Sequence, residues 1–158
     1  MTWRDRIAMG ILLVPTIGLL GQGIVYLTTS EFMPYHSAAL GVPWVELPAN
    51  YQGFVIGVIK GMGAGSIAVS IALLILLWVP VRRGDVWARW AAPVIGMVFT
   101  ALTAYAAFTI DRLTPAATPW RETLLLTPAY LGGGVLSLWP TRRMTKDVRA
   151  APGQGNAN

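Results

Sequence analysis

The stretch YQGFVIGVIKGMGAGSIAVSIALLILLWVP, residues 51–80, is the longest apolar run in the chain and decides the class of fold. A helix that crosses a membrane needs about 20 largely apolar residues. Residues 61–79 supply such a run without any charged side chain. The sequence therefore predicts a membrane-spanning helix over residues 51–79.

Four glycines recur at every fourth position of this span and define what we call the glycine face: Gly53, Gly57, Gly61 and Gly65. Residues four apart lie on one side of a helix, so a second helix can approach this face closely. We therefore predict that the glycine face is a helix-packing surface. A later apolar run is the simplest predicted partner, because it has small residues at the same spacing: Ala92, Gly96, Thr100 and Ala104.

The composition extends this interpretation to the whole chain. Of the 158 residues, 54% are hydrophobic and 12% charged, which is too apolar for an ordinary soluble domain. Further spans are predicted at about residues 7–27, 91–110 and 123–139. The expected fold is an all-α membrane protein, a four-transmembrane-helix bundle within residues 1–141 that has the lipid bilayer as its partner. Residues 142–158 are predicted to form a basic, then polar, disordered cytoplasmic tail.

The arginines predict the orientation of the chain in the membrane. Arg4 and Arg6, the cluster at 82–89 and the cluster at 142–149 all fall on one side of a four-span protein, whereas residues 28–50 contain no Lys or Arg. By the positive-inside rule, both termini are predicted to be cytoplasmic. Because the basic residues lie mostly in short connections and the tail, we predict no nucleic-acid partner.

Residues 28–50 form a connection broken by Pro34, Pro43 and Pro48. Aromatic and polar side chains alternate here, as expected for a chain at the level of the lipid headgroups. The sequence leaves open whether the segment holds a short interfacial helix near residues 36–40 or a partly re-entrant cap over the bundle.

Lys60 is the charge that lies well inside the long apolar run. Counted from Val79, it falls near the outer edge of a hydrocarbon layer of about 30 Å, where a lysine can snorkel to the headgroups. On an ideal helix it also points within about 20° of Gly53, where a lysine needs a partner. We predict an ion pair, with Asp111 as the best-placed carboxylate. The full candidate ligand or ion-pair site at the outer mouth is Lys60, Asp111, Glu31, Glu46, His36, Trp44 and Tyr51.

Metal, cofactor and catalytic signals are weak. The chain has one histidine, His36, and no cysteine, so Cys-ligated metals, thiol redox couples and bis-His haem ligation are excluded. His36 is interpreted as hydrogen-bonded to loop backbone. Gln22, a strongly polar residue in the first span, is interpreted as making an interhelical hydrogen bond. We predict no metal, no cofactor and no catalytic residue.

A resemblance to a known group of proteins rests on three features of the sequence. These are the layout of the spans, the outer connection EFMPYHSAALGVPW at 31–44 and the turn VRRGDVWARW at 81–90. Over about residues 5–140 the chain resembles uncharacterised four-helix bacterial inner-membrane proteins of the DoxX-like or domain-of-unknown-function type. The resemblance implies a multi-pass protein of the bacterial inner (plasma) membrane and brings no established catalytic residues. The cysteines of some redox-linked members are absent here.

Two function classes follow. The first is a non-enzymatic accessory or interaction subunit, with a membrane-protein partner or a second copy of the chain. The alternative is a protein that binds or transports a small or lipid-soluble molecule at the outer mouth of the bundle. An enzyme acting on a lipid-soluble substrate is supported least, because no spacing in the sequence suggests a catalytic constellation.

Overall fold

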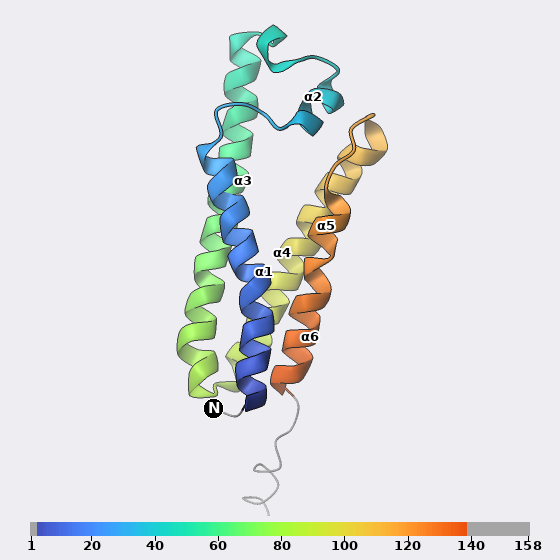
Figure 1. Cartoon of the computed structure of the whole chain (residues 1–158). Helices are drawn as coiled ribbons and strands as arrows, with labels where there is room; N and C mark the ends of the chain where they lie inside the picture. Colours follow the sequence, from blue (N-terminus) through green and yellow to red (C-terminus); the bar gives the residue numbers. More distant parts are fainter. Residues whose placement is uncertain (1–2, 139–158) are drawn as a thin grey trace, which may run out of the picture.

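The computed structural model describes residues 3–138, and in this range it is all-α (Figure 1). Three helices are long and apolar enough to cross a membrane: α1 (Trp3–Thr28), α3 (Ala49–Leu76) with its π-helical continuation η2 (Leu77–Val81), and α4 (Val86–Leu113). The all-α class and the first three predicted spans are therefore confirmed.

The flanks of these helices are apolar and open. Within the most apolar window of each, only 33% of residues in α1, 33% in α3 with η2 and 22% in α4 are buried inside the protein. Large side chains such as Val14, Ile75 and Leu102 lie on these flanks, with exposed fractions of 73%, 57% and 64%. A soluble monomer does not expose apolar surface on this scale, so the chain is a small helical membrane protein.

The fourth predicted span has a different form. Two short helices, α5 (Trp120–Leu124) and α6 (Leu126–Leu138), return the chain along α4 to the end where α1 begins (Figure 1). Neither is long enough to be recognised as a span by itself. Residue 139 and the predicted tail at 142–158 lie outside the described residues.

Small residues lie where pairs of helices pack closely against each other. α1 packs against α3 where Gly23 faces Gly63, and a Cβ added to Gly63 would lie 2.8 Å from the Gly23 carbonyl oxygen. α4 packs against α6, where the Tyr130 ring lies over Gly96 and the hydroxyls of Thr100 and Thr127 are 3.0 Å apart. Close backbone approach of this kind is the main source of attraction between helices in lipid.

The predicted packing of the glycine face against the small residues of α4 is not found in the described chain. All four of its glycines are exposed, and a Cβ added at any of them would meet no atom within 4 Å. α3 instead turns Ile59, Gly63 and Ser66 towards the bundle. The small residues of α4 are buried as a set, but against α6 rather than the glycine face. The spacing misleads because α3 has small residues on both sides, and only the side with Gly63 also carries buried apolar neighbours.

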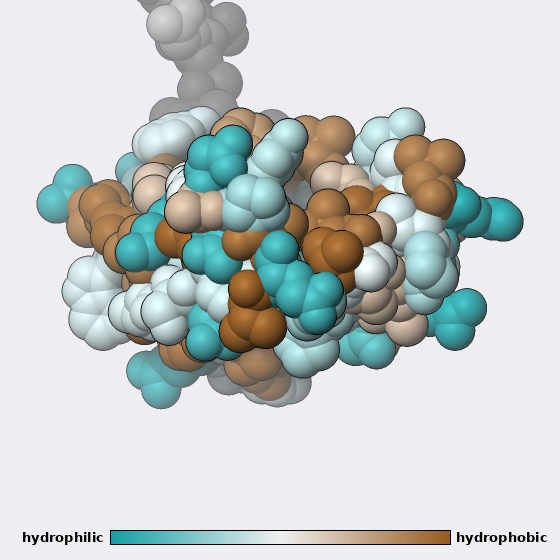
Figure 2. All heavy atoms as spheres, turned by 90° about the horizontal axis from the view of Figure 1, so that it is seen from above, coloured by the Kyte–Doolittle hydropathy of each residue, from teal (hydrophilic) through white to brown (hydrophobic). Residues whose placement is uncertain are grey.

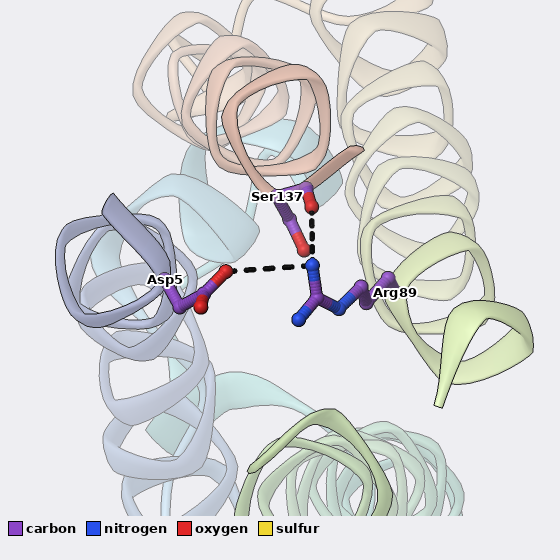
Figure 3. A network of polar contacts seen from close by, with 3 residues as sticks. All are labelled: Asp5, Arg89 and Ser137. Carbon is purple, nitrogen blue, oxygen red and sulfur yellow. Dashed lines mark hydrogen bonds and ion pairs between the residues drawn. The ribbon is translucent and has the colours of Figure 1, made fainter. Parts of the chain in front are cut away.

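A polar cluster fastens the end of the molecule where α1 begins (Figure 3). The Nη1 atom of Arg89 lies 3.4 Å from Oδ1 of Asp5 and donates a hydrogen bond of 3.0 Å to the Ser137 carbonyl oxygen. The two charged side chains are mostly buried, with exposed fractions of 21% and 15%. The cluster therefore connects the first turns of α1 and α4 with the last turn of α6.

The opposite end is covered by the connection between α1 and α3. It contains α2 (Pro34–Leu40) and the 3₁₀ turn η1 (Trp44–Glu46), and α2 lies across the end of the bundle (Figure 1). Of the two alternatives that the sequence left open, a short helix is formed, and it covers the predicted residues 36–40. Seen from this end, hydrophilic and hydrophobic residues are interspersed over the surface (Figure 2). A mixed surface of this kind suits the polar region of a bilayer better than its hydrocarbon core.

Candidate functional site

A cavity of about 120 Å³ lies beneath α2, and we call it the α2 cavity. Residues of α1, α2, α3, α4, the following loop and α5 line it, so it is closed by parts of the chain that are distant in sequence. Its apolar wall includes Ile59, Met62 and Ile110. Seven polar side chains complete the lining: Gln22, Tyr26, Tyr35, His36, Thr103, Thr118 and Thr123.

The local sequence of α2 places its two aromatic side chains over this cavity. Pro34 occupies the first turn, where its missing N–H costs no hydrogen bond, and Gly41 ends the helix with a φ of 71°. His36 reaches back over the first turn, and its Nδ1 accepts a hydrogen bond of 3.1 Å from the Met33 backbone N–H. The predicted bond between His36 and loop backbone is therefore confirmed. Because Nδ1 is an acceptor, the proton of the neutral ring is on Nε2.

One hydrogen bond joins α2 to the wall of the cavity. The hydroxyls of Tyr26 on α1 and Tyr35 on α2 are 2.7 Å apart. Burial, with a smaller contribution from this hydrogen bond, raises the pKa of Tyr35. Burial also lowers the pKa of His36. Both side chains are therefore uncharged at neutral pH.

The threonines on the other side of the cavity donate their protons to backbone carbonyls. Thr103 donates to Phe99 at 2.8 Å and Thr118 to Ala107 at 2.8 Å. Thr123 likewise donates to a backbone carbonyl, one turn earlier, at 3.0 Å. Each hydroxyl has one proton, so these oxygens offer only acceptor lone pairs to the cavity.

A larger and more open pocket of about 540 Å³ adjoins the α2 cavity, and the two share Tyr35, Thr118 and Pro119 in their linings. Charged side chains appear in this second pocket, among them Asp111 and Arg121. Oδ1 of Asp111 accepts a hydrogen bond of 3.2 Å from the Thr118 backbone N–H, which holds the loop against α4. The wall between the two pockets is therefore anchored by Asp111.

The predicted pair of Lys60 with Asp111 is not formed. In the described part of the chain Lys60 is exposed, lines neither pocket and has no carboxylate within ion-pair distance, so that prediction is wrong. On a helix Lys60 points about 100° away from its neighbour Ile59, which lines the α2 cavity. Asp111 has the backbone N–H of Thr118 as its partner instead.

The other predicted site residues are brought together only in part. His36 lines the α2 cavity and Asp111 the adjoining pocket, whereas Glu31, Glu46 and Tyr51 are exposed and line neither. Trp44 has a structural role: its ring packs edge-on against Phe32 at 4.9 Å, and its carbonyl accepts a hydrogen bond of 2.9 Å from Gln52. The outer-mouth site as predicted is therefore not assembled as one group.

Sequence reasoning missed most of the actual lining. Gln22 carried a usable signal, since an amide inside an apolar span is costly unless it is satisfied. The predicted interhelical hydrogen bond of Gln22 is not found among the described residues, where its partly exposed side chain lines the cavity. The two tyrosines and the threonines gave no comparable signal, because such residues commonly lie at membrane interfaces.

Within residues 3–138 no three His, Asp or Glu side chains gather as a metal site would require. No family model, curated protein or solved structure matches the chain. The resemblance to DoxX-like four-helix proteins stays a prediction.

Proposed function

We propose that the chain is a four-span bacterial inner-membrane protein that binds a small molecule in the α2 cavity, with both termini in the cytoplasm. The observation that carries this proposal is a partly enclosed, mostly apolar space beneath α2 whose lining, in the described part of the chain, includes seven polar side chains. Ligand sites in helical membrane proteins combine an apolar wall with a few converging polar groups. Gln22, a polar side chain of intermediate exposure within an apolar helix, also lines this space.

Binding is favoured over passage through the bundle. The half of the molecule on the other side of the cavity is filled by a core that includes Leu12, Leu73 and Tyr130. The lining of the α2 cavity includes no residue of this core and none at the end that carries Arg89. We therefore propose a binding protein with its site at the outer mouth.

A cavity-filling variant tests this proposal. Ala107 lines the α2 cavity, whereas Ala101 lies on the same helix and does not line it. Thermal unfolding in lipid nanodiscs would be followed against a panel of water-soluble and lipid-soluble compounds. We expect at least one compound to stabilise the wild type and Ala101→Leu but not Ala107→Leu. If every stabilising compound acts equally on Ala107→Leu, the α2 cavity is not the site.

The open glycine face favours a second function, that of an interaction subunit. Its glycines face away from the bundle, and small residues at this spacing allow a helix of a partner or of a second copy to approach closely. A single cysteine at Gly61 is expected to form disulfide-linked dimers in liposomes if the partner is a second copy. A cysteine at Val98, which is exposed on α4, is the control. Equal cross-linking of the two variants would argue against the glycine face as an interface.

A further inference from the structure

We infer that the α2 cavity takes a small, uncharged solute that both accepts and donates hydrogen bonds, such as a short amide, and that this solute enters from water. This inference rests on the proposed binding function. It depends on four features of the site: its size, its lack of charge, the direction of its hydrogen bonds and the pocket that adjoins it.

The size of the cavity limits the ligand. Its volume is about 120 Å³. Sites for drug-sized molecules are several times larger, at about 300–1,000 Å³. The cavity therefore accommodates a molecule of a few non-hydrogen atoms and excludes a lipid, a quinone ring with its tail or a nucleotide.

The lining excludes a charged ligand. Within residues 3–138 no Asp, Glu, Lys or Arg side chain lines the α2 cavity. The two titratable side chains that α2 contributes to the lining are Tyr35 and His36. Both are uncharged at neutral pH, because burial raises the pKa of Tyr35 and lowers that of His36. Asp111 and Glu122 line the adjoining pocket instead, and Asp111 accepts a hydrogen bond from backbone. An ion would lose its hydration here and gain no counter-ion, which is strongly unfavourable.

The hydrogen-bonding groups are divided between the two sides of the cavity. On the side of α1 and α2, the Gln22 amide and the Nε2–H of His36 are donors that have no hydrogen-bond partner within residues 3–138. The Tyr26–Tyr35 pair keeps one proton that neither hydroxyl gives to the other. On the side of α4 and α5, the Thr103 and Thr123 hydroxyls offer only lone pairs. A ligand carbonyl oxygen can therefore accept hydrogen bonds on the side of α1 and α2, and a ligand N–H or O–H can donate on the side of α4 and α5. A short amide has both a carbonyl oxygen and N–H groups.

The adjoining pocket gives the direction of entry. It is open, carries charged residues and shares Tyr35, Thr118 and Pro119 with the α2 cavity. Charged groups of this kind face water rather than lipid. A polar solute therefore reaches the cavity from the aqueous side, past Tyr35, which lines both pockets and whose hydroxyl is hydrogen-bonded to that of Tyr26.

A matched pair of probes tests the ligand class. Acetamide and acetate have the same shape but differ in charge, and saturation-transfer NMR on protein in nanodiscs at pH 7.5 compares them through their methyl signals. We expect roughly millimolar binding of acetamide, at least 10-fold tighter than that of acetate. Acetamide binding should disappear in Ala107→Leu and persist in Ala101→Leu.

A matched pair of variants tests the hydrogen bonds. Thr103 and Thr109 both donate to the carbonyl four residues earlier on α4, but only Thr103 lines the cavity. Thr103→Val is expected to weaken acetamide binding about 3- to 10-fold, and Thr109→Val to leave it unchanged. If the two variants have equal effects, the threonine hydroxyls on the side of α4 and α5 do not accept hydrogen bonds from the ligand.

Two results separate the failure of this inference from that of the proposed function. If acetate binds as well as acetamide, or if the compound that depends on Ala107 is charged or lipid-soluble, the ligand class is wrong while the cavity remains a binding site. If no compound at all depends on Ala107, both the inference and the proposed binding function are overturned.

Discussion

Two glycines on α3 illustrate how residues of one type have opposite surroundings. A Cβ at Gly63 would lie 2.8 Å from both the Gly23 carbonyl oxygen and the Leu27 nitrogen, which are backbone atoms that cannot move without shifting α1. A Cβ at Gly61 would meet nothing within 4 Å. We predict that Gly63→Ala destabilises the protein by about 1–3 kcal/mol and that Gly61→Ala has little effect. Thermal unfolding in detergent measures both, and a larger loss at Gly61 would mean that α3 is rotated.

His36 is the only histidine in the chain, so its NMR signals are unique in a protein without a histidine tag. Burial lowers its pKa below the ordinary value of 6.5 in the folded state. As pH falls below about 6.5 the unfolded chain therefore binds a proton that the folded chain still excludes, and stability decreases until the folded pKa is reached.

We predict a measured His36 pKa below 6.5 and a loss of stability on acidification that is smaller in His36→Gln. An NMR titration gives the first value, and unfolding curves between pH 7.5 and 5 would give the second. A pKa at or above 6.5 would mean that the imidazole is not enclosed under α2.

At the scale of elements, the polar cluster at the start of α1 is predicted to hold three helices together. Arg89 contacts both Asp5 and the last turn of α6, and its Nε is buried without a hydrogen-bond partner in the described structure. Arg89→Gln should lower stability by about 1–3 kcal/mol, because a charged group is removed from two partners. The exposed Arg83 is the control, since Arg83→Gln should change stability by under about 0.5 kcal/mol.

Thermal unfolding of the two arginine variants side by side provides the measurement. Equal, small losses would indicate that the cluster contributes no more than an exposed surface charge.

The elements also show which features the sequence made predictable. Apolar runs predict α1, α3 and α4 because length and hydropathy alone decide whether a helix suits a bilayer. α2 was predictable from Pro34 and Gly41, which start and end it. The packing face of α3 was not predictable, because the glycine spacing is compatible with either side of the helix. The α2 cavity was not predictable either, because its lining comes from residues far apart in sequence. Among the lining residues, only His36 belongs to the candidate site predicted from the sequence.

At the scale of the whole molecule, the apolar flanks and the two polar ends fit a protein that crosses a bilayer. α3 with η2 has 33 residues, or about 50 Å of helix, and so exceeds a hydrocarbon layer of about 30 Å. This length is enough to carry the connection that contains α2 beyond the hydrocarbon layer. α5 and α6 run back to the level of Asp5, so the described chain begins and ends at one end of the bundle (Figure 1).

The most direct test of the account is the side of the membrane on which each end of the bundle lies. The chain has no native cysteine, so single cysteines at Ala38 on α2, at Ala117 near α5 and at Arg83, together with one added after Asn158, report on the connections and the C-terminus. With an impermeant maleimide on spheroplasts, we predict labelling at Ala38 and Ala117 only, and labelling of the other two after permeabilisation. Labelling of Arg83 but not Ala38 in intact spheroplasts would reverse the orientation, and labelling of the added C-terminal cysteine together with Ala117 would contradict the fourth crossing.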